Sequence, residues 1–291
     1  MLLFTLVSGV LIGVFYGLMG LGLNFIFGVM KIVNLAHGDF VMLGAFGVYL
    51  GYSVWNLNPI ISLIIEVVIF FIVGIPLYYG FVPRLLQSRD PEMLSLILFF
   101  GLSQVIESLT TFVFGTNPDT VNPTVFGSQP VNLLGQGIQL SWIVAVIISL
   151  IAMAFMYVYL YHTKIGIATR AIMGNRTEAV SSGINVHRVS AIAFAIGISL
   201  AITAGSMTPF ILGGIYPSMG VDLTTTSFAV IVIGSLGNPL GTILGGLIYG
   251  ICLMLMETYL PSWSSLVPYL LLILILLIRP KGLLGRRERN A

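Results

Sequence analysis

Long runs of apolar residues constrain this chain more than any other feature. A helix that crosses a bilayer needs about 20 consecutive, predominantly apolar residues. Runs near this length occupy residues 2–27, 40–57, 60–82, 94–115, 141–161, 191–213 and 259–278. Soluble domains carry about 25% charged residues, whereas only 8% of this chain is charged. The sequence therefore predicts an all-α, polytopic membrane protein, with residues 1–291 in a single transmembrane domain.

A further uncharged stretch, residues 224–256, is interrupted by glycine and proline at 234–241. Each of its two arms is short for a full crossing. We therefore predict about eight transmembrane helices together with re-entrant or broken segments. The first apolar run lacks the basic start of a signal peptide and is longer than its apolar part, so we interpret it as a retained membrane segment.

The basic residues predict how the chain is oriented. Of the 12 lysines and arginines, all but Lys31 fall in segments 83–93, 162–190 and 279–291. They are Arg84 and Arg89; Lys164, Arg170, Arg176 and Arg188; and Arg279, Lys281, Arg286, Arg287 and Arg289. Lysine and arginine in short loops mark the cytoplasmic side. We therefore expect segments 56–59, 116–140 and 214–224, which have no basic residue, to be external.

This alternation also tests the interrupted stretch 224–256. If it crossed the membrane once, the basic tail 279–291 would end outside. It must therefore cross twice or re-enter, with the turn at 234–241 at depth or near the cytoplasm. Counting two crossings back from the external segment 56–59 places the N-terminus outside as well.

Two helix breaks fall within apolar surroundings. Backbone at bilayer depth must be hydrogen-bonded, so breaks occur where protein or a water-filled cavity surrounds them. The first break, 31–39, contains Asn34, His37, Gly38 and Asp39, and the second contains Gly234, Gly237, Asn238, Pro239 and Gly241. Asn238 is a good helix N-cap, and Pro239 suits the first helical position. Paired interruptions indicate a transport pathway, although tight turns between packed helices explain either break equally well.

Three glutamates lie in or at the ends of apolar runs, where a carboxylate suggests function by default. Glu107 and Gln104 lie on adjacent turns and form a candidate polar interior contact along the pathway. Glu66 is close enough to the end of its run to reach the interface. Glu257 is near an external end, which favours an interfacial position.

Other features are interpreted as structural. Gly9, Gly13 and Gly17 recur every four residues, which favours helix packing over pore lining. Cys252 is the only cysteine, so a disulfide within the chain is excluded. His37 has no second ligand at metal-binding spacing, so no metal site is predicted. The chain shows no enzyme motif, and no basic cluster interleaved with aromatic residues that would suggest nucleic acid.

Five short motifs occur in one order along the chain. They are N-x-A-H-G (Asn34, Ala36, His37, Gly38); G-x-x-x-R-A (Gly166, Arg170, Ala171) with A-x-x-x-G-I-N (Ala179, Gly183, Ile184, Asn185); Ala204-Gly205; G-x-x-G-x-x-x-G (Gly234, Gly237, Gly241); and R-P-x-G-L-x-G (Arg279, Pro280, Gly282, Leu283, Gly285). Together they resemble the permease subunits of branched-chain amino acid ABC importers. The resemblance covers nearly the whole chain.

The resemblance implies that loop 162–190 couples the permease to an ATPase. The loop is long enough for a short helix at about 177–182, ending at Gly183. The implied coupling residues are Gly166, Arg170, Ala171, Arg176, Glu178, Ala179, Gly183, Ile184 and Asn185. ABC permeases carry E-A-A-x-x-x-G here, whereas this chain has Val180 in place of the second alanine and one residue fewer before glycine.

The resemblance also implies a subunit that is not itself an enzyme and needs no cofactor. Its expected partners are a second, homologous permease, two cytoplasmic ATPases, an external solute-binding protein and the lipid of a prokaryotic inner or plasma membrane. The substrates would be branched-chain amino acids or related amino acids and amides. A stand-alone secondary transporter or channel is the alternative, with Glu107, Glu66 and His37 as its coupling candidates. A membrane scaffold is a third possibility, but it leaves the broken helices unexplained.

Overall fold

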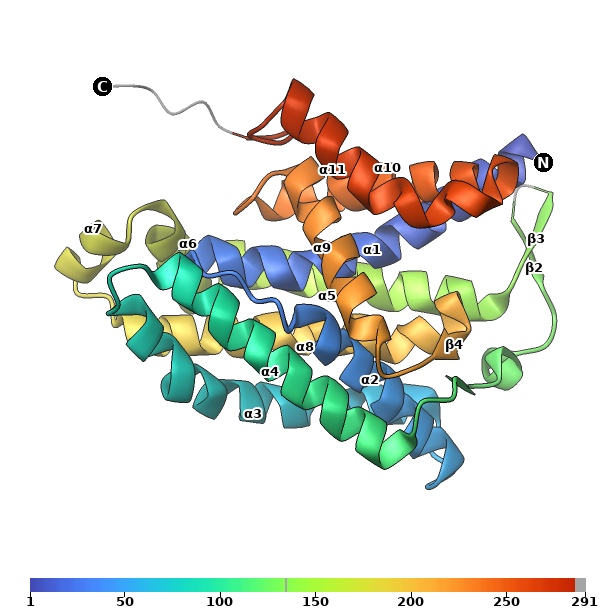
Figure 1. The fold of residues 1–291 in the computed structure, drawn as a ribbon, viewed down its shortest axis with the longest axis horizontal. Coiled ribbons are helices and arrows are strands. Elements are labelled where there is room, and N and C mark those ends of the chain that lie inside the picture. The colour runs from blue at the N-terminus through green and yellow to red at the C-terminus, as the bar shows by residue number, and fades with distance from the viewer. Residues whose placement is uncertain (134, 286–291) are drawn as a thin grey trace.

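A computed structural model of the protein describes residues 1–133 and 135–285. Its elements, in chain order, are α1 (Leu2–Met30), α2 (His37–Ser53), α3 (Pro59–Leu86), α4 (Pro91–Phe114), β1 (Asp119–Thr120), η1 (Pro123–Phe126), β2 (Val131–Leu133), β3 (Gln136–Ile138), α5 (Leu140–His162), α6 (Lys164–Gly174), α7 (Arg176–Ser181), α8 (Val186–Leu212), β4 (Gly214–Ile215), α9 (Met219–Gly234), α10 (Pro239–Tyr259), η2 (Pro261–Leu266) and α11 (Val267–Ile278) (Figure 1). Arg286, Arg287 and Arg289 of the predicted basic tail lie outside the described residues.

Among the described residues, seven helical segments are long and apolar enough to cross a membrane: α1, α3, α4, α5, α8, α10, and η2 joined to α11. This confirms the predicted polytopic all-α fold. Helices α2 and α9 have only 17 and 16 residues. At 1.5 Å per residue each is about 25 Å long, less than the roughly 30 Å hydrocarbon core. The full span predicted at 40–57 is therefore corrected to a partial one.

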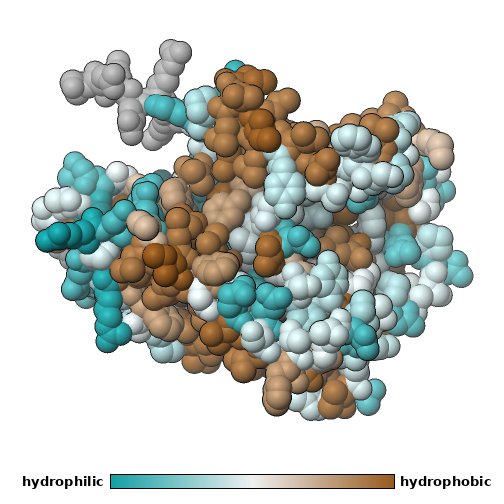
Figure 2. All heavy atoms as spheres, in the orientation of Figure 1, coloured by the Kyte–Doolittle hydropathy of each residue, from teal (hydrophilic) through white to brown (hydrophobic). Residues whose placement is uncertain are grey.

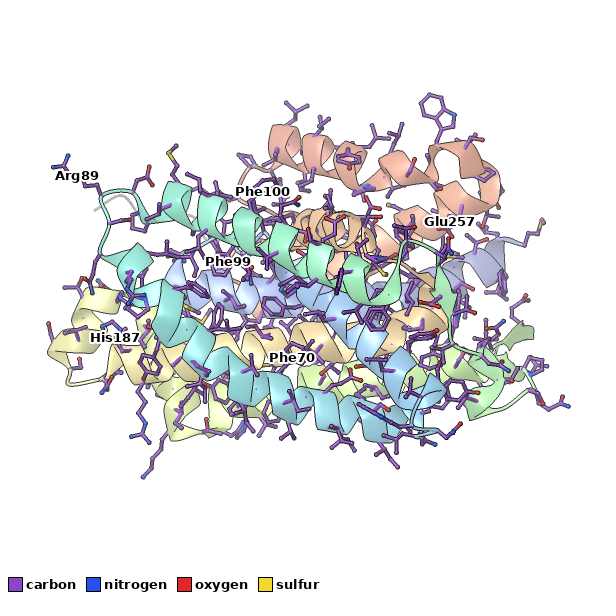
Figure 3. The ribbon with its side chains drawn as sticks, turned by 60° about the horizontal axis from the view of Figure 1, so that its bottom comes forward. Phe70, Arg89, Phe99, Phe100, His187 and Glu257 are labelled. Carbon is purple, nitrogen blue, oxygen red and sulfur yellow. The ribbon has the colours of Figure 1, made fainter. Side chains whose placement is uncertain are left out.

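Helices α1 and α8 form the centre of the protein. In their most apolar stretches, 61% of α1 and 94% of α8 residues are buried, against 17% in α3 and 22% in α4. The outer helices therefore expose their apolar side chains, as helices that face lipid do. On α4, Phe99 points into the protein and Phe100 points away from it (Figure 3).

Helices α1 and α10 pack closely and antiparallel, with Thr5 Oγ1 3.1 Å from Thr258 Oγ1 near one end of the pair. A Cβ on Gly9 would lie 2.8 Å from the Cα of Ile251. A Cβ on Gly13 would lie equally close, 2.8 Å, to the Cα of Leu247. The glycine repeat is thus a contact surface for a helix that follows more than 200 residues later, which confirms the packing interpretation.

The basic segments gather at one end of the molecule, which we call the basic end. It holds α6, α7 and the α3–α4 connection, while the strands and the N-terminus lie at the opposite end, the strand end (Figure 1). The α9–α10 turn is also at the basic end, because Gly28 of α1 lies against both Met173 of α6 and Gly237. The positive-inside rule predicts that the basic end is cytoplasmic.

The path of α9 and α10 confirms that the stretch 224–256 goes in and comes back. Helix α9 ends in the turn at the basic end, where Leu283 N donates a hydrogen bond of 2.9 Å to Ile233 O. Helix α10 then returns to the strand end. The external loop predicted at 214–224 is corrected, because Ile215 and Met219 are buried and α9 already begins at Met219. β4 pairs with β1 across the strand end, and the chain then enters the protein.

Candidate functional site

The first predicted break is present and lies near the middle of the helix bundle. Helix α1 ends at Met30, with Lys31 in the left-handed region (φ 54°), and α2 begins at His37. His37 Nε2 is 2.9 Å from Met19 O. Met19 is 11 residues from the end of α1, which is roughly 16 Å along the helix. The chain thus runs back from the basic end before α2 starts at mid-depth.

Helix α9 holds the start of α2 in place. Gly38 N donates a hydrogen bond of 2.9 Å to Thr224 Oγ1, which itself donates one of 3.1 Å to Leu35 O. The two backbones approach so closely that a Cβ on Gly38 would overlap Gly220 O. The short helices α2 and α9 therefore meet at mid-depth. The sequence analysis did not single out Thr224 or Gly220, because neither breaks a hydropathy pattern.

Three side chains at this junction carry buried polar atoms without a partner. Asn34, His37 and Asp39 are each 1% exposed or less. Asn34 Nδ2, His37 Nδ1 and both carboxylate oxygens of Asp39 make no hydrogen bond within the described residues. Ser103 of α4 lies near the Asp39 carboxylate as a longer polar contact, outside hydrogen-bond geometry, and the Glu107 carboxylate is a further neighbour. Buried polar atoms are normally paired, so several unpaired ones in one place make this junction a candidate site; we call this group the mid-depth cluster.

Gln104 and Glu107 do not form the predicted interior contact. Gln104 is exposed on α4, Glu107 is partly exposed, and no hydrogen bond joins them in the described structure. Hydrophilic residues occupy the middle of the face shown in Figure 2, over α4 and α9, between apolar surfaces. Gln104 is exposed on α4, and the half-buried Glu107 lies near Asp39 of the mid-depth cluster.

The second predicted break also forms as expected locally. Helix α9 ends at Gly234 and α10 begins at Pro239. Asn238 Oδ1 accepts a hydrogen bond of 3.3 Å from Gly241 N, as an N-cap does. Gly237 has φ 77°, a conformation that glycine adopts without strain.

The sequence analysis missed the residue that holds this turn, Asn24 of α1. Its Nδ2 donates hydrogen bonds of 3.1 Å to Ser235 O and Asn238 O. The same nitrogen also lies within hydrogen-bond distance of Thr242 Oγ1, so three acceptors share its two hydrogens, and Asn24 Oδ1 accepts from Gly237 N. Asn24 is fully buried. Its signal in the sequence is an amide in an otherwise nearly apolar run.

The structure does not bring the two breaks together. Thr224 marks the mid-depth cluster, and Gly234 lies ten residues further along the same helix, which is about 15 Å. The cluster around His37 and Asp39 is therefore separate from the turn, which lies at the basic end. The pathway predicted from both breaks divides into two regions.

A polar groove lies between α9, α10 and the segment formed by η2 and α11. Asp222 and Thr225 of α9 line a cavity of about 280 Å³ together with Tyr16, Tyr249 and Glu257. Asp222 is exposed although it lies 12 residues before the end of α9, roughly 18 Å from the basic end. Glu257 lies toward the strand end of α10 (Figure 3), in agreement with its predicted position. Sequence analysis missed Asp222, because it falls in the segment predicted to be an external loop.

Glu66 does not reach the interface, contrary to prediction. It is 8% exposed, and its Oε2 accepts a hydrogen bond of 2.9 Å from Ser206 Oγ of α8. Gly47 of α2 leaves the space that the carboxyl group occupies. The residue thus joins α2, α3 and α8. Within the described residues, no group of three or more histidine, cysteine or carboxylate side chains could hold a metal ion.

Residues 5–276 match the family model described as "Branched-chain amino acid transport system / permease component". The chain belongs to this permease family. It is 28% identical to the high-affinity branched-chain amino acid transport system permease protein LivH of Escherichia coli, over 97% of this chain and 94% of LivH. It is 26% identical to BraD of Pseudomonas aeruginosa, over 97% and 95%. The ribose import permease RbsC of Bacillus subtilis is 30% identical over 55% of this chain. No solved structure is significantly similar.

The family match and the spans make this chain a multi-pass inner-membrane permease subunit of a transport system. Its loop 162–190 contains two helices, α6 and α7, where the sequence analysis predicted one. Helix α7 (Arg176–Ser181) confirms the predicted helix to within a residue, and Gly183 follows it with φ 79°. Asn175 caps α7, and its Nδ2 donates a hydrogen bond of 2.7 Å to Glu178 Oε1.

The predicted coupling residues differ in what they can contact. Arg170, Ala171, Glu178, Gly183 and Asn185 are exposed, Arg176 and Ile184 are half-buried, and Gly166 and Ala179 are buried. Gly166 packs directly against the Tyr159 carbonyl of α5, and Arg170 stacks 4.5 Å from the centre of the Tyr161 ring. Val180, which replaces an alanine of the family pattern, is 57% exposed. The surface of α7 thus offers an apolar side chain beside the Glu178 carboxylate.

Proposed function

We propose that this chain is the membrane-spanning subunit of an ATP-driven importer of branched-chain amino acids or related amino acids and amides. The observation that carries the proposal is the family match over residues 5–276. LivH and BraD are named as permeases of high-affinity branched-chain amino acid transport systems. The chain has no phosphate-binding loop, so ATP hydrolysis belongs to separate cytoplasmic subunits.

The polar face over α4 and α9 is the proposed surface for a second permease and for the pathway between the two. Asp222 is exposed at membrane depth, and a carboxylate facing lipid costs several kcal/mol. A neighbouring subunit or a water-filled pathway removes this cost. Glu107 continues the polar surface to Asp39 and His37, which would place the mid-depth cluster beside the same pathway.

The mid-depth cluster is the proposed moving part of that pathway. Helices α2 and α9 both end short of a full crossing, and they meet through the hydrogen bond from Gly38 N to Thr224 Oγ1. The polar atoms of Asn34, His37 and Asp39 lack partners in this arrangement. A second arrangement of the two helices could pair them, and switching between packings is how transporters alternate access.

Helices α6 and α7 form the proposed contact with the ATPase. They project from the basic end (Figure 1), and α7 carries Val180 and Glu178 on its exposed surface. An exposed apolar side chain on a short, capped helix suits insertion into a groove of a partner. Closure of the ATPases on ATP would then push α7, and with it α8, which follows directly at Val186.

Reconstitution in liposomes tests the proposal. The chain would be combined with the second permease, the ATPases and the binding protein, and uptake of labelled leucine would be measured. We expect uptake only when ATP and the binding protein are both supplied. Uptake that persists without ATP and disappears when ion gradients are dissipated would support a secondary transporter instead and would refute the proposal.

The docking helix has its own test. Val180→Asp places a charge where the partner groove is expected, so the amount of ATPase that copurifies with the chain should fall at least fivefold. Val54→Asp is the matched control, since Val54 is also exposed (60%) but lies at the far end of α2. Equal ATPase recovery with both variants would show that α7 is not the docking element.

A further inference from the structure

A large cavity opens at the strand end, away from the mid-depth cluster. It has a volume of about 890 Å³ and lies between the strand ends of α1, α5 and α8. Small-molecule sites typically have 300–1,000 Å³ and mostly apolar walls with a few polar groups. Phe4, Tyr52, Trp142 and Phe210 supply aromatic surface, and no charged side chain lines the cavity within the described residues.

Two helix ends meet at this cavity with opposite polarity. Helix α8 ends at Leu212 with no capping hydrogen bond from Gly213, and Pro209 to Gly213 line the cavity. The last carbonyl groups of a helix lack partners and carry its negative dipole end. Helix α5 starts beside them at Leu140, and its N-cap Gln139 makes no side-chain capping bond. Its first N–H groups present the positive dipole end.

A buried hydroxyl gives an independent sign that the cavity binds a polar ligand. Ser8 of α1 is fully buried and lines the cavity. Its Oγ makes no hydrogen bond to any described residue. By contrast, Ser149 and four other serines within the described helices each donate to the carbonyl four residues earlier. The Ser8 hydroxyl is therefore free to donate to a ligand.

We propose that this cavity binds a zwitterionic α-amino acid with an aliphatic side chain, on the external side of the permease. The ammonium group would face the carbonyl groups at the end of α8. The carboxylate would face the N–H groups at the start of α5 and the Ser8 hydroxyl, and the side chain would lie against Trp142 and Phe210. The choice of ligand rests on the proposed import function, whereas the site lies outside the polar face over α4 and α9.

Equilibrium binding of labelled leucine to the full chain in phosphatidylcholine nanodiscs tests the site. We expect saturable binding, and at least tenfold weaker competition by 4-methylpentanoate and isopentylamine, which each lack one of the two charged groups. Ser8→Ala should weaken leucine binding about fivefold to tenfold, the effect of one lost hydrogen bond. Ser149→Ala is the matched control, because Ser149 is equally buried and does not line the cavity; its leucine affinity should be unchanged.

The outcomes separate this inference from the proposed function. Absence of leucine binding to the chain, while the reconstituted importer still takes up leucine, overturns the site alone. Equal competition by all three compounds overturns it as well, because the cavity would then select only for apolar bulk. Leucine binding that vanishes when phosphatidylethanolamine is added identifies a lipid headgroup as the occupant and also overturns the proposal. Failure of ATP-dependent uptake itself refutes the proposed function.

Discussion

Replacing Asn24 by leucine should destabilise the chain by about 2–4 kcal/mol. Asn24 Nδ2, which has two hydrogens, lies within hydrogen-bond distance of three acceptors, Ser235 O, Asn238 O and Thr242 Oγ1, and Asn24 Oδ1 accepts from Gly237 N. Leucine is close in volume but bonds none of them. Side-chain hydrogen bonds in membrane proteins contribute about 0.6 kcal/mol on average and up to about 1.7. Ser235 O and Asn238 O keep backbone partners, whereas the half-buried Gly237 N–H loses its acceptor. An unpaired donor costs about 1–3 kcal/mol when fully buried, which is the upper bound for Gly237.

The free energy of unfolding in mixed detergent micelles measures this effect. Gln104→Leu is the matched control, since Gln104 is an exposed amide on another span and makes no hydrogen bond in the described structure; we expect a change within about 0.5 kcal/mol. The hydrogen bond from Leu283 N to Ile233 O fixes the C-terminal segment to the end of α9, next to the α9–α10 turn. Proteolysis of that segment should therefore accelerate in Asn24→Leu. An Asn24→Leu variant as stable as the wild type would refute the assignment of Asn24 as the residue that holds the turn.

Three further predictions follow from the packing. Gly13→Val should cost about 2–3 kcal/mol of unfolding free energy, because its Cβ would lie 2.8 Å from Leu247 Cα; an unchanged micelle titration would contradict the close contact. Glu66→Gln should stay within about 0.5 kcal/mol, since the amide has the same shape, whereas Glu66→Ala should lose about 2–3 kcal/mol through the cavity it leaves; equal losses would argue against this. In a Cys252→Ala background, Thr225→Cys should react with a water-soluble maleimide in the isolated chain and be protected in the assembled importer. Ile72→Cys, on the lipid-facing side of α3, is the control and should not show this pattern. Equal labelling of both would contradict a polar, partner-covered face.

The sequence alone predicted the features that depend on neighbouring residues. Apolar run length predicted the spans apart from the one at 40–57, and the positions of Lys and Arg predict the orientation, because insertion into lipid depends on local composition. The caps at Asn238 and Gly183 were predictable for a similar reason, since capping involves residues three or four apart. The glycine repeat in α1 predicted a close helix contact but could not name α10 as its partner.

The family resemblance likewise came from short motifs in order, and the match over residues 5–276 confirms it. The motifs located the junction at Asn34 to Gly38 without revealing its partners. They also located loop 162–190, in which α7 was expected and α6 was not.

Only the tertiary structure decided how deep each segment lies and what it contacts. Helix α2 starts at mid-depth because His37 bonds Met19 O and Gly38 N bonds Thr224 Oγ1, two contacts that span 18 and 186 residues. In the sequence, Asn24 and Glu66 are polar residues in apolar runs with no visible partner. Their partners come from distant segments: the α9–α10 turn and α10 for Asn24, and α8 for Glu66. Hydropathy depends on composition within a window, whereas hydrogen bonding at depth depends on which distant backbone arrives there. The sequence therefore predicted most of the crossings, and the fold decided the partial ones, α2 and α9, and the site between them.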